Sequence, residues 1–423
     1  MSKNIKGAIP KWRFLEFKGN GDWERKKLGK MAFIVNDKIA IEKLNAETYI
    51  STENMLPNFA GVSTASQLPQ TGNFTKFKAG DILVSNIRPY LKKVWRSNKT
   101  GGASNDVIVF RSNSDIDSNF LEFILKNELF INYVMKNAKG LKMPRGDKES
   151  MLIYPVYIPP YPTFSEQQKI ADCLSSIDDL ISAEEKKLSL LNDYKKGWMQ
   201  KLFPAEGKTV PEWRFPEFQD SEEWAQKKLD EIGKFIRGFS YSSQDTTYDK
   251  TKLLVIRSNN IVPMGKTDYI NNLRYVNKKC SEEQNLVFGD ITICMANGSS
   301  NLIGKSSFYD GGYPGDITVG AFCGIFRSPL PIVRYLFQTN QYNRELQRVS
   351  QGGDGAIANL KEIDIKNIEF LLPTLTEEQQ KIAGFLSGID DLITRQTDRI
   401  EALKQHKKAL MQGLFPSIEE VCK

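Results

Sequence analysis

An internal repeat divides this chain of 423 residues into two halves and constrains its fold more than any other feature. The segment EQQKIADCLSSIDDLI at 166–181 returns 212 residues later as EQQKIAGFLSGIDDLI at 378–393. The offset stays constant to the endings Leu-Phe-Pro at 202–204 and 414–416. A long, dense repeat of this kind indicates two copies of one structural plan.

Each half also opens with a repeated motif, KWRFLEF at 11–17 and EWRFPEF at 212–218. Between the opening and the close, the halves diverge and keep only short fragments. These are Gly-Asp-Ile at 80–82 and 289–291 and Phe-Arg-Ser at 110–112 and 326–328. We therefore predict two variable globular units, each followed by a shared segment, and a short tail. The predicted boundaries are 1–163 and 205–375 for the units, 164–204 and 376–416 for the shared segments, and 417–423 for the tail.

The shared segments have the pattern of long amphipathic helices. Apolar residues recur alternately four and three positions apart once Glu184 and Lys195, with Gln396 and Lys407 in the second copy, are admitted as polar members. Each helix would run for about 38 residues, or roughly 57 Å at 1.5 Å per residue. The apolar positions predicted to face a partner helix are Ile170, Leu174, Ile177, Ile181, Leu188, Leu191, Trp198 and Leu202, with Ile382, Leu386, Ile389, Ile393, Ile400, Leu403, Leu410 and Leu414.

Helices with such a stripe cannot stay single in water, because the apolar face would be exposed. We predict that they form an antiparallel coiled coil, which would hold the variable units at opposite ends and relate the halves by a pseudo-two-fold axis. The alternative is that each helix belongs only to the core of its own domain. The variable units combine apolar, β-branched runs at 77–85, 107–110, 287–294 and 365–372 with helical patterns at 120–135 and 331–349. The predicted fold class is therefore mixed α/β (α+β).

Composition excludes several classes of protein. No apolar run approaches the roughly 18 residues that span a bilayer, and the five cysteines lack paired spacing. We therefore expect a cytoplasmic chain with reduced thiols and no membrane partner. The chain has no visible catalytic or metal site: Pro159-Pro160 follows Ile158, where an amino-methyltransferase needs Asp or Asn, and the lone histidine, His406, lies among lysines.

Positive charge is concentrated in the first unit. Residues 1–163 carry 25 Lys and Arg against 15 Asp and Glu, while the rest of the chain is close to neutral. This balance suits a polyanionic partner. Two basic runs, 88–96 and 139–148, mix cations with aromatic residues and turn formers, although a solvated surface would look similar. The candidate DNA contacts in the first unit are Arg88, Tyr90, Lys92, Lys93, Arg96, Lys142, Arg145 and Lys148.

The corresponding regions of the second unit are polar rather than basic. Asn and Gln side chains can bond adenine edges in pairs, although they are equally good turn formers. The candidate DNA contacts in this unit are Arg257, Asn259, Asn260, Asn297, Ser299, Asn301, Lys305 and Gln351.

The duplicated helix motif EQQKIA, its Leu-Phe-Pro ending, the WRF openings and the GDI strands resemble those of the specificity (S) subunit of type I restriction-modification systems. The resemblance covers essentially the whole chain. It implies two target recognition domains, each reading one half of a split double-stranded DNA sequence, with the paired helices as a spacer. It also implies two methyltransferase (M) subunits that supply S-adenosylmethionine and adenine-N6 chemistry, and restriction (R) subunits that use ATP and Mg. The chain itself would be a non-catalytic subunit without a cofactor.

Two other functions are compatible with the same residues. One is the specificity subunit of a type II enzyme, which would differ in lacking ATP-driven translocation. The other is a coiled-coil adaptor that binds only protein, and a salt-sensitive shift of duplex DNA would exclude it.

Overall fold

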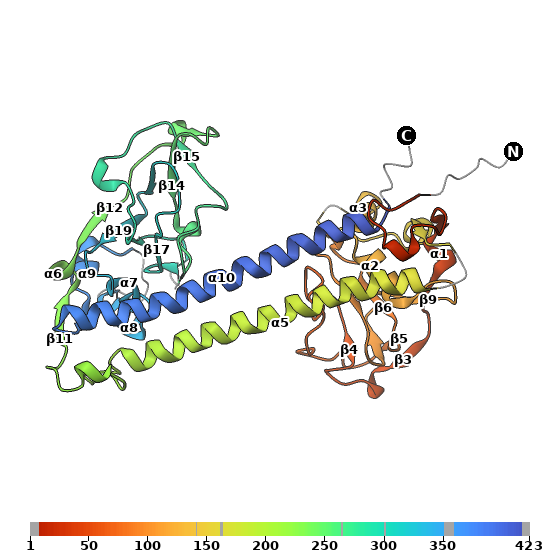
Figure 1. The fold of residues 1–423 in the computed structure, drawn as a ribbon, viewed down its shortest axis with the longest axis horizontal. Coiled ribbons are helices and arrows are strands. Elements are labelled where there is room, and N and C mark those ends of the chain that lie inside the picture. Colours follow the sequence, from red (N-terminus) through yellow and green to blue (C-terminus); the bar gives the residue numbers. More distant parts are fainter. Residues whose placement is uncertain are drawn as a thin grey trace. The chain divides into compact units, whose positions relative to one another are not determined.

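The computed structural model describes residues 8–140, 142–160, 164–263, 265–299, 302–350 and 359–416. The chain divides into two compact units, 1–186 with 397–423, and 187–396 (Figure 1). Two long helices, α5 (Ser165–Leu202) and α10 (Thr376–Leu414), contribute to both units. Each unit therefore contains the first part of one long helix and the last part of the other.

Within the described residues, the first unit contains three sheets and, besides its parts of the long helices, four short α-helices. Its two-stranded antiparallel sheet pairs β1 (Glu24–Lys27) with β10 (Pro155–Ile158). One four-stranded sheet has the strand order β2 (Ala32–Ile34), β9 (Val107–Ser112), β6 (Ile82–Ser85), β7 (Val94–Arg96). The other four-stranded sheet has the order β3 (Lys38–Ala40), β5 (Asn73–Phe77), β8 (Gly101–Ala103), β4 (Tyr49–Ile50). The helices are α1 (Leu28–Met31), α2 (Ser118–Lys126), α3 (Glu128–Lys136) and α4 (Lys148–Ile153).

The second unit repeats the first two sheets in the same order. They are β11 (Ala225–Lys228) with β20 (Glu369–Leu372), and β12 (Lys234–Arg237), β19 (Cys323–Arg327), β16 (Ile291–Cys294), β17 (Ser306–Phe308). The third sheet has a different order: β13 (Thr246–Thr247), β15 (Tyr275–Val276), β14 (Leu253–Ile256), β18 (Ile317–Val319). The helices are α6 (Leu229–Ile232), α7 (Val333–Leu336), α8 (Asn340–Ser350) and α9 (Glu362–Lys366). The duplication therefore extends to sheets whose sequences have diverged.

Several of the predicted elements differ in extent or type, and the run 287–294 forms a strand only from Ile291, where β16 begins. The run 77–85 is not one strand, because a turn at Gly80, with φ of +89°, separates β5 from β6. The run 120–135 is broken at Asn127, whose side chain accepts a hydrogen bond from the Leu129 N–H and so caps a second helix. The region 331–349 is likewise divided between α7 and α8, and 365–372 begins in α9 before its strand. Short apolar runs occur in buried helices and in buried strands, so periodicity alone could not distinguish a helix from a strand in these runs.

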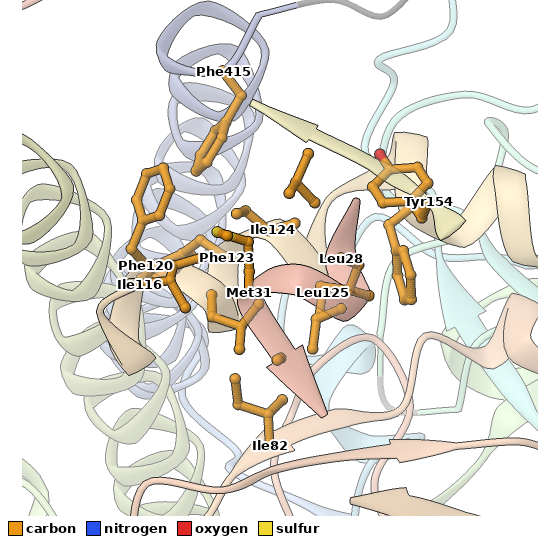
Figure 2. Close-up of a cluster of buried hydrophobic side chains, with 14 of the residues drawn as sticks. Leu28, Met31, Ile82, Ile116, Phe120, Phe123, Ile124, Leu125, Tyr154 and Phe415 are labelled. Atoms are coloured by element: carbon orange, nitrogen blue, oxygen red, sulfur yellow. The ribbon is translucent and has the colours of Figure 1, made fainter. Parts of the chain in front are cut away.

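The end of α10 completes the hydrophobic core of the first unit. Phe415 is only 8% exposed and stacks on Phe120, with ring centroids 5.3 Å apart (Figure 2). It also meets Trp23 edge to face at 6.4 Å. The backbone N–H of Trp12 donates to the Gly413 carbonyl oxygen at 2.8 Å. The opening motif of the first half is thus joined to the helix that closes the second half.

The second unit has the same arrangement with the end of α5. Leu202 and Phe203 lie in its core, and the Phe203 ring meets Trp224 edge to face at 6.1 Å. The backbone N–H of Trp213 donates to the Lys201 carbonyl oxygen at 3.0 Å. The Leu-Phe-Pro ending of each long helix therefore packs in the domain formed by the other half of the chain.

The start of each long helix is fixed by a buried carboxylate. Glu166 accepts hydrogen bonds from the Arg13 guanidinium at 2.7 and 2.8 Å and from Trp23 Nε1 at 3.2 Å. In the second unit, Glu378 accepts the same bonds from Arg214, at 2.7 Å twice, and from Trp224 at 3.3 Å. The Glu378 carboxylate holds the pKa of Arg214 above its usual value. The Arg of each opening motif, and a Trp ten residues after it, thus bind the Glu of the helix motif.

The two long helices are antiparallel within each unit. In the first unit, Lys407 Nζ lies 2.5 Å from the Asp178 carboxylate and Lys404 Nζ lies 2.6 Å from Glu185. From the first pair to the second, the residue number rises from 178 to 185 in α5 and falls from 407 to 404 in α10, so the two helices run in opposite directions. In the second unit, Lys195 Nζ lies 2.8 Å from Asp390. Because the repeat offset is 212, this is the same ion pair in the other copy.

Every apolar position that was predicted to face the partner helix is buried or half-buried. Several of them also belong to the domain cores. These are Ile170, Leu174 and Leu414 in the first unit, and Leu202, Ile382, Leu386 and Ile389 in the second. The stripe therefore contributes to both the helix pair and the globular domains.

This packing predicts that Phe415→Ala destabilises the first unit selectively. Loss of a buried phenyl ring from a packed core costs roughly 3–5 kcal/mol of unfolding free energy. We expect faster hydrogen exchange in β6 and β9 but not in β16 and β19, measured by mass spectrometry in mild urea. Phe203→Ala is the matched control and should reverse the pattern. Equal acceleration in both units by either variant would contradict the docking of each helix end in one domain.

Candidate nucleic-acid interface

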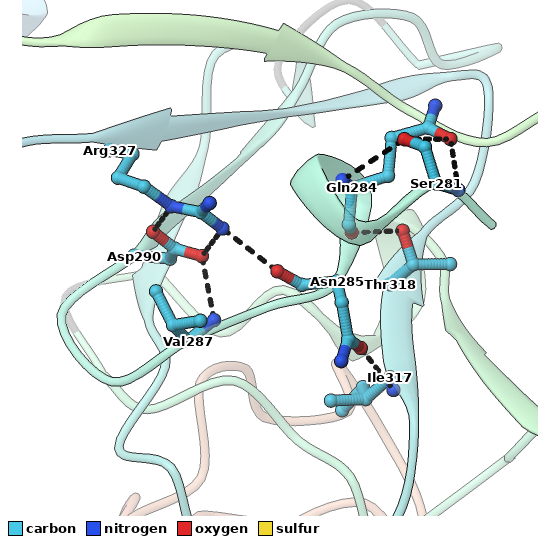
Figure 3. Close-up of polar contacts among 8 residues, drawn as sticks. All are labelled: Ser281, Gln284, Asn285, Val287, Asp290, Ile317, Thr318 and Arg327. Carbon is cyan, nitrogen blue, oxygen red and sulfur yellow. Dashed lines mark hydrogen bonds and ion pairs between the residues drawn. The ribbon is translucent and has the colours of Figure 1, made fainter.

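The strand that leads into the candidate site is anchored in the same way in both units. Asp81, which is buried at the start of β6, accepts hydrogen bonds from Arg111 Nε and Nη2, both at 2.7 Å. Its counterpart Asp290 accepts from Arg327 at 2.8 and 2.7 Å and from the Val287 N–H at 2.9 Å (Figure 3). Each aspartate raises the pKa of its arginine. These ion pairs fix where β6 and β16 begin, and hence where the loops at their far ends emerge.

In the first unit, the loop after β6 meets the second basic run. The Arg88 N–H donates to the Pro144 carbonyl oxygen at 2.8 Å, and the Gly146 N–H donates to the Asn86 carbonyl oxygen at 3.0 Å. Arg145 and Lys139 exchange two backbone hydrogen bonds of 2.9 Å. The two basic runs, about 50 residues apart in the chain, therefore form one surface.

A third segment supports this surface through an unusual backbone. The N–H groups of Asn58 and Phe59 donate to the carbonyl oxygens of Leu91 and Lys92 at 3.0 and 2.9 Å. Asn58, Phe59, Arg88 and Lys92 all have positive φ, between 50° and 63°. Residues other than glycine rarely adopt this conformation, and its cost persists only where surrounding contacts enforce it. The three loops therefore hold one another in a defined shape.

The cationic side chains of the first basic run differ in whether they are bonded to other residues of the domain. Lys92 forms an ion pair with Glu128, Lys93 Nζ donates to the Thr52 carbonyl oxygen at 2.6 Å, and Arg96 Nε lies 3.1 Å from Glu122. These three side chains are tied to the domain. Residues with exposed side chains among the predicted contacts are Arg88, Tyr90, Lys142, Arg145 and Lys148. Of these, Arg88, Lys142 and Lys148 make no side-chain hydrogen bond or ion pair within the described part of the chain.

In the second unit, predicted residues from two separate segments line one cavity of about 980 Å³. Arg257 and Asn259 enter from the turn after β14, and Asn297 from the loop after β16. Asn297 Nδ2 donates to Ser258 Oγ at 3.0 Å, which joins the two segments. The Arg257 guanidinium donates to the Asn272 carbonyl oxygen at 2.9 Å. The cavity therefore presents amide and guanidinium groups held by internal contacts.

One predicted contact must be corrected. Asn260 is 1% exposed, its Oδ1 accepts from the Arg257 N–H at 3.2 Å and its Nδ2 donates to the Asn271 carbonyl oxygen at 2.8 Å. Its amide holds the loop and is not accessible to a ligand. Ser299 is exposed and Lys305 is half-buried, whereas Asn301 and Gln351 lie outside the described residues.

Sequence reasoning missed several residues of the cavity wall. These are Tyr241, Arg274, Phe322 and Asn359. They come from four separate segments of the sequence, so only the folded chain brings them together. Phe322 is 72% exposed and comes directly before β19. The neighbouring Cys323 is buried, which raises the pKa of its thiol to about 12, so it is neutral at ordinary pH.

The described residues offer neither a metal site nor a membrane span. In the described ranges, no group of three or more His, Cys, Asp or Glu side chains is arranged to hold a metal ion. The same ranges contain no helix with the length and apolar character needed to cross a membrane.

Known proteins resemble the chain over most of its length. It is 26% identical over 427 residues to the type I restriction enzyme MjaVIII specificity subunit of Methanocaldococcus jannaschii, covering 93% of this chain and 92% of that one. A shorter match, 27% identical over 201 residues, links it to the EcoKI specificity subunit of Escherichia coli, with 45% of this chain and 42% of that protein covered.

A solved structure has a similar fold. The S subunit of a type I restriction-modification system from M. genitalium covers 97% of this chain and 99% of its own, with a TM-score of 0.60 and 16% identity. The family model described as "Type I restriction modification DNA specificity domain" matches residues 20–193 and again 221–405, once in each half. These two matches span most of the sequence, and the chain belongs to the family of type I restriction modification DNA specificity domains.

Proposed function

We propose that this chain is the DNA-specificity subunit of a type I restriction-modification complex, with one half of a split duplex sequence read by each unit. The observation that carries the proposal is the repeated frame of β6 and β16, which ends in loops of different chemistry. One loop is basic and the other is rich in amides. A duplicated frame with divergent loops suits the reading of two different half-sites.

The exposed groups suit contact with duplex DNA. Free cations such as Arg88, Lys142 and Lys148 provide the phosphate contacts that dominate affinity. Arginine and asparagine side chains supply the paired hydrogen bonds that distinguish bases in the major groove. We assign DNA binding to the surface formed by 86–92, 139–140 and 142–148 in the first unit, and to the cavity of the second.

We also propose that the long helices set the spacing between the half-sites. Each helix begins in the core of one unit and ends in the core of the other, as Ile170 and Leu202 do in α5. A continuous helix between two docking points has a length fixed by its residue count, at 1.5 Å per residue. The length of the helix pair then limits which DNA spacers both units can engage.

Catalysis and cofactors are assigned to partner subunits. We propose that two methyltransferase subunits bring S-adenosylmethionine, that restriction subunits bring ATP and Mg, and that this chain provides only recognition and docking. Support comes from the family and from the relatives, which are named as specificity subunits of type I restriction enzymes.

The direct test is methylome sequencing of a host that carries this chain with its methyltransferase subunit. We expect one split recognition sequence that disappears when this chain is deleted. Methylation that continues unchanged would rule out the proposal. Dependence of cleavage on ATP-driven translocation would distinguish a type I from a type II system.

The free cations predict a specific salt dependence. Replacing Arg88 and Lys142 together by alanine should weaken duplex binding by the complex and reduce the slope of log affinity against log salt by about 2, one for each lost phosphate contact. Fluorescence anisotropy between 50 and 200 mM salt measures both quantities. The control is Lys26→Ala on β1, a half-buried lysine outside the proposed surface whose side chain is 41% exposed, which should leave the slope unchanged. An unchanged slope in the double variant would exclude these two side chains from DNA contact.

The helix pair predicts that spacer length can be altered separately from the half-sites. Seven residues inserted at equivalent positions of both helices, after 188 and after 400, keep the apolar stripe in register. They add about 10 Å, so the recognised spacer should lengthen by up to about three base pairs. Methylome sequencing would report the new spacer with both half-sites retained. A change in either half-site would show that the helices do not act as a spacer, and an insertion in α5 alone should abolish methylation.

A further inference from the structure

Two backbone contacts define a frame at the tip of β6 in the first unit. The Asn86 N–H donates to the Asp106 carbonyl oxygen at 2.8 Å, and the Asn86 carbonyl oxygen accepts from the Gly146 N–H at 3.0 Å. An isolated antiparallel bridge pairs Ile87 with Arg145. Asp106 and Arg145 therefore contact Asn86 and Ile87, the two residues that directly follow β6.

The second unit has the same frame at the tip of β16. The Met295 N–H donates to the Phe322 carbonyl oxygen at 2.9 Å, and the Met295 carbonyl oxygen accepts from the Leu360 N–H at 2.8 Å. An isolated antiparallel bridge pairs Ala296 with Asn359. The contacts match those of the first unit one for one, so Phe322 stands where Asp106 does and Asn359 stands where Arg145 does.

These two matched positions differ in chemistry and are accessible. The Arg145 side chain is 57% exposed and one of its Nη atoms lies 3.4 Å from the Asp106 carboxylate. In the second unit, Asn359 is exposed and lines the 980 Å³ cavity together with Phe322. The frame uses backbone atoms only, so these side chains are free to vary without loss of the loop.

We propose that these positions select one base pair in each half-site, guanine–cytosine by the first unit and adenine–thymine by the second. The inference rests on the proposed function. Arginine bonds guanine O6 and N7 as a pair, asparagine bonds adenine N6 and N7 as a pair, and an aromatic ring packs on the thymine methyl group. Arg145 would read guanine. Asn359 would read adenine while Phe322 contacts the methyl group of its partner.

Asp106 acts as a positioning residue in this scheme. Its carboxylate holds the Arg145 guanidinium through a charge-assisted contact, which limits the orientations in which the planar fork can meet a base edge. Lys92 and Arg96 are half-buried and paired with glutamates. The exposed Arg88 guanidinium is the other arginine fork near this frame, and we assign it to phosphate contact.

The test measures methylation by the complex of this chain with its methyltransferase subunits. Initial rates are compared on duplexes in which each base pair of the half-sites, apart from the methylated adenine, is replaced in turn. We expect Arg145→Ala to lose the preference for guanine at one position of one half-site, by roughly 5- to 150-fold. The other half-site should be unaffected. Asn359→Ala is the matched control and should lose the preference for adenine at one position of the other half-site only.

Three further outcomes decide the interpretation. Arg145→Lys keeps the charge but not the fork, so the guanine preference should stay lost while overall binding is retained. Asp106→Asn should weaken the same preference without changing any other position. If Arg145→Ala lowers the rate equally on every duplex, Arg145 contacts phosphate and the inference is overturned. If the wild-type complex shows no sequence preference at all, the proposed function itself fails.

Discussion

The buried ion pair between the opening motif and the helix motif is the contact on which the architecture depends. Glu166 and Glu378 are withdrawn from water, so each needs the arginine and tryptophan that bond it. Removing one partner of such a pair typically costs 3–5 kcal/mol, because a buried charge is left uncompensated. The pair fixes where each long helix starts. The Leu-Phe ending of the same helix packs in the core of the other unit.

Because each long helix ends in the core of the other unit, the residues that build the framework are separate from the loop side chains that can vary. Each domain core includes residues of both long helices, and β6 and β16 are anchored by equivalent Asp–Arg pairs. At Asp106 and Arg145, and at Phe322 and Asn359, the contacts that hold the loops are backbone hydrogen bonds, which place no demand on the identity of these four side chains. Side chains at the loop tips can therefore change without loss of packing. A chain built in this way can acquire new binding specificity in one unit while the other is unaffected.

The sequence was informative wherever a pattern was long or repeated. The constant offset and the heptad stripe identified both helices, and density of charge identified the basic runs. Contacts between distant single residues left no such pattern, so Phe322 and Asn359 were missed, as was the meeting of Arg88 with Pro144. Asn260 was misjudged because an asparagine that bonds its own loop and one that bonds a base look identical in sequence. The break at Asn127 was missed for a related reason, since apolar spacing continued through the capping residue.

The antiparallel direction of the helix pair is favoured by two charged positions in each helix, Asp178 and Lys195 in α5 and Asp390 and Lys407 in α10. With a constant offset of 212, parallel helices in register would place Asp178 beside Asp390 and Lys195 beside Lys407. Such half-buried like charges would repel strongly, whereas the antiparallel arrangement pairs each lysine with the aspartate of the other helix. Burial lowers the pKa of Lys195 even with its partner present, so this position is costly to charge without a carboxylate nearby. A helix motif that occurs twice thereby favours antiparallel pairing through its charges as well as through its apolar face.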